Sequence, residues 1–143
     1  MRRPAVPAFA TPEGHTVKKM RTLIVDDSQA FLKAARSLLA TIEEVEVVGA
    51  ATSGEEALRE VAHLAPDLVL MDVMMPGMNG FEAARLICAM KRPPIVVFVS
   101  LHDGAPYLEA ARRSGAAALI SKHSFCDDLP ALIRHLSDLA PMQ

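Results

Sequence analysis

The chain has 143 residues, of which 51% are hydrophobic, and this length suits one compact domain with a substantial core and leaves no room for a second. The formal net charge is −2, with charges of both signs dispersed and no basic stripe, which argues against direct nucleic-acid binding by this chain. The sequence has no apolar run of about 18 residues that could cross a membrane, and two cysteines without CxxC spacing favour a reduced, cytoplasmic setting.

The N-terminal part of the chain shows the periodicity of neither a helix nor a strand. Residues 1–19 are rich in Ala, Pro and Thr, and the first residues lead to prolines instead of an apolar segment. We therefore expect a flexible tail over residues 1–19, without an export signal, followed by one domain over residues 20–140.

The first strand is predicted over residues 21–26, where apolar side chains run together. A helix follows, with Ser28 as its N-cap and apolar residues at every third or fourth position. Residues 45–51 predict a second strand. The helix after it opens with Ser53 and Glu56, whose spacing predicts a capping box.

The third strand, residues 68–71, leads into a turn rich in Pro, Gly and Asn over residues 75–80. A third helix follows this turn and stops before two consecutive prolines. Residues 95–99 are the most β-branched stretch of the chain, and they predict the fourth strand.

The last part of the chain repeats the same alternation. Asp103 or Gly104 opens the fourth helix, residues 116–121 predict the fifth strand, and a final helix follows, with Pro130 expected in its first turn. Strands that alternate with helices favour a parallel sheet with right-handed crossovers and helices on both faces. The expected fold class is therefore α/β, a three-layer sandwich around a doubly wound five-stranded parallel sheet with five helices.

Charged side chains occur where predicted strands end. Asp26 and Asp27 end the first strand, Asp72 follows the third, and Lys122 follows the fifth. Because the carboxyl ends of neighbouring parallel strands line one crevice, these side chains could converge there. Carboxylates so close together would repel one another unless a divalent cation joined them.

In this order, the residues resemble the receiver domain of two-component response regulators. The resemblance covers about residues 20–138. Each motif alone is common, but all of them together on this strand pattern are specific. The resemblance implies the flavodoxin-like strand order 2-1-3-4-5. The motifs are Asp26-Asp27, then Asp72 with Val73-Met74-Met75-Pro76-Gly77-Met78-Asn79-Gly80, then Ser100, Gly115-Ala116 and Lys122.

The resemblance implies a phosphoryl acceptor and a metal site. Asp72 would be the acceptor, attacking the phosphorus of a phosphohistidine on a sensor histidine kinase or a histidine phosphotransfer protein. Asp26, Asp27 and Asp72 would hold Mg²⁺, with the backbone carbonyl of Met74 as a further ligand.

The resemblance also implies a phosphate clamp and residues that tune it. Lys122 would contact one phosphoryl oxygen and the Ser100 hydroxyl another. His102 and Met74 lie two residues beyond the serine and the acceptor, where side chains flank the phosphoryl group, and we expect them to set its lifetime. Leu119 stands three residues before the lysine, where most receivers have Tyr or Phe as the switch that reports phosphorylation.

The lysine is followed by His123, where this family commonly has proline, often with a cis bond, so the geometry of this bond stays open. None of the five histidines shows metal-ligand spacing.

The leading hypothesis is a stand-alone signalling switch, not an enzyme with a separate substrate: phosphorylation would change its affinity for a downstream protein. The usual contact surface of the family is built from the fourth helix, the fifth strand and the fifth helix, and a homodimer through it is an open alternative. The chain could also be part of a longer protein.

A second hypothesis is a pseudo-receiver that binds its partner independently of phosphorylation, and Leu119 motivates it. A third, an aspartate-nucleophile phosphatase, is disfavoured because Met74 stands where such enzymes have an acid.

Overall fold

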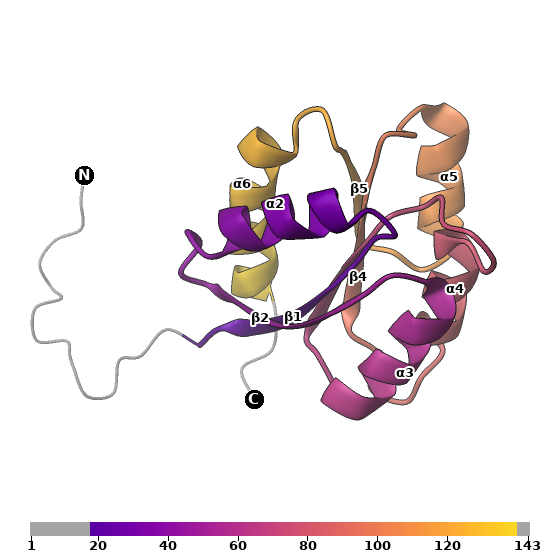
Figure 1. Ribbon diagram of the computed structural model, residues 1–143, viewed down its shortest axis with the longest axis horizontal. Coiled ribbons are helices and arrows are strands. Elements are labelled where there is room, and N and C mark those ends of the chain that lie inside the picture. The colour runs from indigo at the N-terminus through magenta and orange to yellow at the C-terminus, as the bar shows by residue number, and fades with distance from the viewer. Residues whose placement is uncertain (1–17, 140–143) are drawn as a thin grey trace, which may run out of the picture.

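The computed structural model describes residues 18–139, and the predicted flexible tail, residues 1–19, lies outside this part except for its last two residues. Ten elements follow one another here, strands alternating with helices (Figure 1). Their bounds are β1 (Met20–Val25), α2 (Gln29–Leu39), β2 (Val45–Ala51), α3 (Gly54–Leu64), β3 (Leu68–Met71), α4 (Gly80–Cys88), β4 (Ile95–Ser100), α5 (Ala105–Arg113), β5 (Ala118–Ser121) and α6 (Phe125–Leu139).

The strands form one parallel sheet with the order β2-β1-β3-β4-β5, which confirms the predicted fold class and strand order. The order of the strands reverses between β1 and β3, so the chain leaves these two neighbours toward opposite sides of the sheet. Val25 pairs with Met71 in the register of β1 and β3, and the residues that follow both strands therefore emerge side by side. A crevice at such a switch point is where ligands bind in open α/β sheets.

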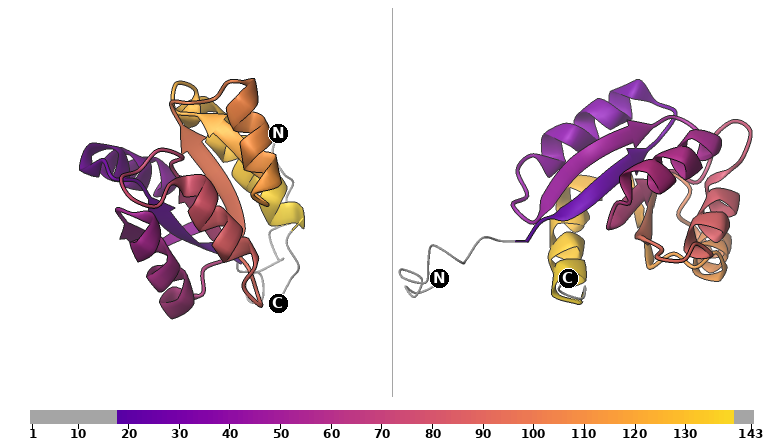
Figure 2. Two further views of the ribbon diagram at one scale, coloured as in Figure 1. Left: turned by 90° about the vertical axis from the view of Figure 1, so that its right-hand side faces the viewer. Right: turned by 90° about the horizontal axis from the view of Figure 1, so that it is seen from below.

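Helices cover both faces of the sheet (Figures 1 and 2). Helices α2 and α6 lie on one face, and α3, α4 and α5 lie on the other. The apolar residues divide accordingly into two buried clusters. The first joins α2 and α6 to the sheet and includes Ile24, Leu32, Leu39, Leu70, Val97, Leu129 and Ile133. The second joins α3, α4 and α5 to it and includes Leu23, Val61, Met71, Ala84, Ile87, Phe98 and Ala111.

Side chains fix the starts of the helices, mostly as predicted. Ser28 caps α2 by accepting a hydrogen bond from the backbone of Phe31. Ser53 caps α3, but the predicted capping box is wrong, because the Glu56 carboxylate accepts from the backbone and the hydroxyl of Thr52. Two donors on Thr52 outcompete the single N–H of Ser53.

A complete capping box forms instead at the start of α4, between Asn79 and Glu82.

The expected position of Pro130 in the first turn of the last helix is wrong. Helix α6 starts at Phe125, earlier than expected, and Pro130 therefore lies in its second turn. Within residues 18–139 every peptide bond is trans, including the one between Lys122 and His123. In the same part of the chain, no helix is both long enough and apolar enough to cross a membrane.

Candidate functional site

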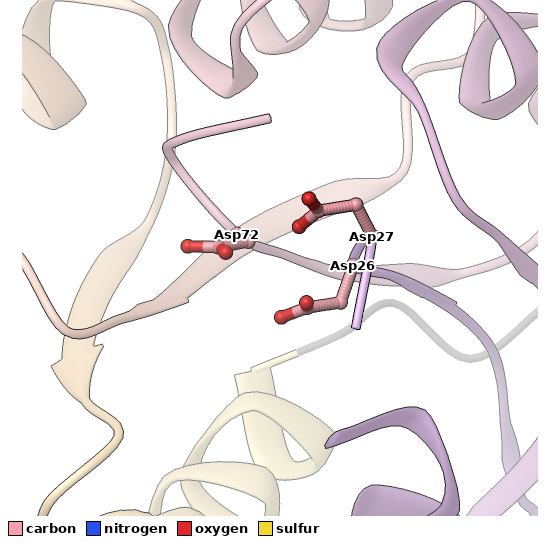
Figure 3. A group of neighbouring side chains, drawn as sticks. All are labelled: Asp26, Asp27 and Asp72. Atoms are coloured by element: carbon pink, nitrogen blue, oxygen red, sulfur yellow. The ribbon is translucent and has the colours of Figure 1, made fainter. Parts of the chain in front are cut away.

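Three carboxylates meet at the carboxyl ends of β1 and β3 (Figure 3). Asp26 and Asp27 follow β1 and Asp72 follows β3, and one oxygen from each lies within 4.8 Å of the others. Asp26 and Asp72 are 1% and 8% exposed, whereas Asp27 is open to solvent. The sheet register places the two buried acids next to each other, because the backbone N–H groups of Asp26 and Asp72 continue the ladder to Ala51 and Val25.

One oxygen of each buried acid is held by a backbone N–H group. Oδ1 of Asp26 accepts from Ser28 at 2.9 Å, and Oδ1 of Asp72 accepts from Val73 at 2.8 Å. The second oxygen of each acid faces Lys122. The Oδ2 atom of Asp26 is fully buried.

Lys122 reaches this pocket from the end of β5. Its Nζ lies 2.7 Å from Oδ2 of Asp26 and 3.3 Å from Oδ2 of Asp72, and its side chain is only 14% exposed. The backbone N–H of Lys122 donates to Ser100 on β4, which holds the root of the side chain. The ammonium also lies 4.3 Å from the centroid of the Phe31 ring.

Burial and charge shift two pKa values in the pocket. Burial raises the pKa of Asp26, and the Asp72 charge raises it further, against the opposing effects of Lys122 and Ser28. For Lys122, burial lowers the pKa, but the contact with Asp26 and the charge of Asp72 outweigh this effect, so its pKa is raised. The ammonium therefore stays charged, while the neighbouring carboxylates crowd one another.

These residues fit a divalent cation. The three carboxylates and one ammonium leave two negative charges in a small space, which a divalent ion would neutralise. The Oδ2 atom of Asp26 offers a buried acceptor, which lies 2.7 Å from the Lys122 ammonium. Carboxylate oxygens are the ligands that Mg²⁺ prefers in proteins. The donor set thus suits Mg²⁺, with Asp26, Asp27 and Asp72 as the side chains that would hold it.

The other predicted residues lie on or just beyond β3, β4 and β5. Ser100 is fully buried at the end of β4, and its hydroxyl accepts a hydrogen bond from the backbone of His102. The His102 side chain is exposed and its ring lies 5.2 Å from that of Tyr107. Met74 is 50% exposed, two residues beyond the acid on β3. Leu119 is half-buried, pairs with Phe98 in the sheet and packs on the second apolar cluster.

Three contributors to the site escaped the sequence analysis in this role. Phe31 lies under Lys122, Ser28 binds Asp26 as well as capping α2, and Gly80 packs on the backbone beside Asp72. A Cβ atom at Gly80 would lie 2.9 Å from Cα of Val73 and closer still to the Asp72 carbonyl oxygen. Phe31 and Gly80 stand in motifs that are visible in the sequence, but their contacts depend on how the helices approach the sheet.

The comparisons with known proteins agree with this geometry. The family model of the response regulator receiver domain matches residues 22–134. A protein-glutamate methylesterase/protein-glutamine glutaminase of Nocardioides sp. is 42% identical over 105 residues, which cover 72% of this chain and 29% of that protein. The response regulator GacA of Pseudomonas viridiflava is 36% identical over 115 residues, 80% of this chain and 54% of that protein. The chain spans between 27% and 55% of the length of the first curated relatives.

Solved structures give the same result. The response regulator domain of Thermotoga maritima CheB superimposes with a TM-score of 0.78 at 32% identity, covering 87% of this chain and 100% of that one. The signal receiver domain of NarL from Mycobacterium tuberculosis gives 0.79 at 29% identity, covering 85% and 98%. The fold, the matched residues and these similarities agree, and the chain belongs to the receiver-domain family of two-component response regulators.

Proposed function

We propose that this receiver domain accepts a phosphoryl group on Asp72 from a phosphohistidine of a sensor histidine kinase or a histidine phosphotransfer protein. The observation that carries the proposal is the ring of contacts around Asp72: two further carboxylates within 4.8 Å and the Lys122 ammonium at 3.3 Å. A phosphoryl group that arrives here meets a nucleophile, a candidate cation site and a fixed positive charge.

In the transfer step, a carboxylate oxygen of Asp72 forms a bond to phosphorus as the bond between phosphorus and the donor histidine breaks. Asp26, Asp27 and Asp72, with the backbone carbonyl of Met74, would hold Mg²⁺, which when bound supplies positive charge to the phosphoryl oxygens. Lys122 binds another phosphoryl oxygen. The Ser100 hydroxyl donates to a third, and the hydrogen bond that it accepts from the His102 backbone does not occupy its proton.

The lifetime of the aspartyl phosphate is proposed to depend on the exposed residues His102 and Met74, which lie two residues beyond Ser100 and Asp72. If they restrict the approach of water, His102→Ala and Met74→Asn change the rate of dephosphorylation, measured by loss of phosphate after removal of the donor. Unchanged rates in both variants would show that these side chains do not tune the reaction.

The output is proposed to be a change of affinity for a downstream protein, with the domain, residues 20–140, acting as a cytoplasmic switch and not as an enzyme with a separate substrate. The contact surface would be formed by α5, β5 and α6, the surface that receivers commonly use. The exposed Leu108 on α5 gives this surface an apolar residue. A homodimer through the same face is a further possible form of the output.

A direct test of the acceptor uses acetyl phosphate and Mg²⁺, followed by intact mass. The wild type should gain one phosphoryl group and Asp72→Asn should gain none. Asp72 is 8% exposed, and its Oδ1 accepts a hydrogen bond from the backbone N–H of Val73. The side-chain oxygen of asparagine can accept the same hydrogen bond, so the variant should fold. No adduct on the wild type, or an equal adduct on the variant, would contradict the proposal.

Leu119 favours a second candidate, a pseudo-receiver whose binding to its partner ignores phosphorylation. Leucine has neither the flat ring nor the hydroxyl of the usual switch residue, so the pocket could be intact without its usual connection to the output surface. Partner affinity measured with and without beryllofluoride distinguishes the two. An increase or decrease supports the switch, and equal affinities support the pseudo-receiver.

A further inference from the structure

The ammonium of Lys122 has a third neighbour that carries no charge. Besides the carboxylates of Asp26 and Asp72, it lies over the face of the Phe31 ring, 4.3 Å from the centroid. The negative face of an aromatic ring attracts a cation, and the attraction is stronger where water is excluded. With 14% of the Lys122 side chain exposed, the contact is largely shielded from solvent.

The position of the Phe31 ring is tied to the acidic pocket through the start of α2. The backbone N–H of Phe31 donates to the Ser28 hydroxyl, and the backbone N–H of Ser28 donates to Oδ1 of Asp26. The ring is therefore anchored to the same short segment that holds one of the carboxylates. A shift of the start of α2 would move the ring and disturb the hydrogen bond that holds this carboxylate.

A second aromatic ring, from the C-terminal helix α6, packs against Phe31. Phe125, at the start of α6 and 5% exposed, meets it with a centroid distance of 5.1 Å and an interplanar angle of 53°. Phe125 follows Lys122 by three residues, so both contacts of Phe31 come from the segment after β5. The Phe31 ring thus lies between α2 and α6, with the Lys122 ammonium over its face.

The three neighbours of the ammonium respond differently to a cation. Mg²⁺ bound to Asp26 and Asp72 would draw on the same carboxylate charge that now holds Lys122, and it would repel the ammonium. The uncharged ring does not compete for the metal, because Mg²⁺ binds carboxylate and water oxygens in preference to an aromatic ring. The attraction between Phe31 and Lys122 is therefore the one of the three that the metal does not compete for.

On this basis we propose that Phe31 is a positioning residue, which holds the Lys122 ammonium at the pocket when the carboxylates bind the cation and thereby keeps it ready for a phosphoryl oxygen. The benefit of this positioning rests on the proposed function, because it concerns phosphoryl transfer. The contact between Phe31 and Lys122 does not require phosphorylation. Phe31 acts through Lys122 and touches neither metal nor phosphate.

The first experiment measures the ring contact directly. Protons above an aromatic ring resonate upfield, so the ε-methylene protons of Lys122 should show an upfield shift that Phe31→Leu removes. We expect most of this shift to persist when Mg²⁺ is added to the wild type at saturation. Its absence from the metal-free protein, or its disappearance with Mg²⁺, would overturn the proposal, because the lysine would then not be held by the ring.

The second experiment weakens the attraction without changing the shape of the side chain much. Phenylalanine with increasing fluorine content, introduced at position 31, should lower the initial rate of phosphorylation by acetyl phosphate stepwise, by about two- to fivefold for the fully fluorinated ring. The same series at position 125 is the matched control, since Phe125 packs on Phe31 and Lys122 lies over the Phe31 ring. No change there is expected.

Equal effects at both positions would indicate packing instead of positioning, and no effect at position 31 would show that the contact does not assist transfer. Either result would overturn the proposal. A wild type that accepts no phosphoryl group would contradict the proposed function instead, and the Lys122 shift in the presence of Mg²⁺ would then decide the role of Phe31.

Discussion

At the scale of residues, the pocket combines groups that oppose one another without a ligand. Asp26 is buried beside another carboxylate, and its pKa is raised chiefly by burial. Lys122 offsets part of this charge but cannot balance three acids. The pocket can therefore accept further positive charge, and its buried carboxylate charge lowers the free energy of unfolding of the metal-free protein.

This tension predicts that Asp26→Asn stabilises the metal-free protein at neutral pH. A raised pKa means that the folded state favours the protonated form of Asp26, so the stability associated with this group is present below its ordinary pKa of 3.8 and is lost as pH rises through the raised value. A neutral asparagine avoids that loss. Urea unfolding in the presence of a chelator should give a higher free energy of unfolding for the variant at pH 7.

The same comparison at low pH supplies the control for this prediction. Below pH 3.8, where the wild-type carboxyl is also neutral, the difference between the two proteins should shrink. A variant that is less stable than the wild type at pH 7 would mean that the ion pair with Lys122 outweighs the burial of the charge.

At the scale of elements, the start of α4 is fixed against Asp72, the proposed acceptor. The backbone N–H of Gly80 donates to the Val73 carbonyl at 2.7 Å, and the Asn79 and Glu82 capping box holds the same turn. The absence of a Cβ atom at Gly80 lets the helix approach the backbone of Asp72. The helix therefore helps to position Asp72.

Gly80→Ala should accordingly separate α4 from the acceptor and lower both stability and phosphorylation. The added atom would meet the backbone of Asp72 and Val73, which cannot yield as a side chain does. We expect a loss of about 2 kcal/mol in the free energy of unfolding, measured in urea, together with slower phosphorylation by acetyl phosphate.

Gly49→Ala on β2 is the matched control for this effect. Its Cβ atom would also lie close to a neighbour, at 2.8 Å, but that neighbour is the end of the flexible Leu64 side chain. The change in stability should be less than about 1 kcal/mol. Losses of equal size in both variants would show that α4 is not held against the acceptor by this contact.

At the scale of the whole molecule, the sheet brings together residues from three separate parts of the chain. Asp26, Asp72 and Lys122 meet because β1, β3 and β5 run parallel and end at the same edge. This convergence follows from the sequence, since the apolar runs and helical spacing define the alternation and the charged residues stand at the strand ends. The fold class was predictable for the same reason.

Other features of the molecule depend on competition in three dimensions. The Glu56 carboxylate binds Thr52, which sequence spacing does not distinguish from a capping box with Ser53. Helix α6 begins early enough to include Pro130 in its second turn. The contact of Phe31 with Lys122 requires that α2 packs beside the start of α6, and periodicity does not specify this packing.

Binding of Mg²⁺ should stabilise the molecule as a whole, because the unfolded chain does not hold the carboxylates together. At a concentration of about 100 times the dissociation constant, the gain in the free energy of unfolding is about 2.7 kcal/mol. Thermal unfolding with Mg²⁺ and with chelator measures it. Asp27→Asn should reduce the gain, and Asp127→Asn, an exposed acid in the first turn of α6, should leave it intact. An equal gain in Asp27→Asn and the wild type would exclude the carboxylate pocket as the site.

The central claim is that this pocket transfers a phosphoryl group to Asp72 with the help of a divalent cation. The most direct measurement treats the protein with acetyl phosphate, reduces it with borohydride, which converts an aspartyl phosphate to homoserine, and locates the product by peptide mass spectrometry. The account predicts homoserine at position 72 with Mg²⁺ and much less with a chelator. Homoserine at another aspartate, or none in the presence of Mg²⁺, would contradict it.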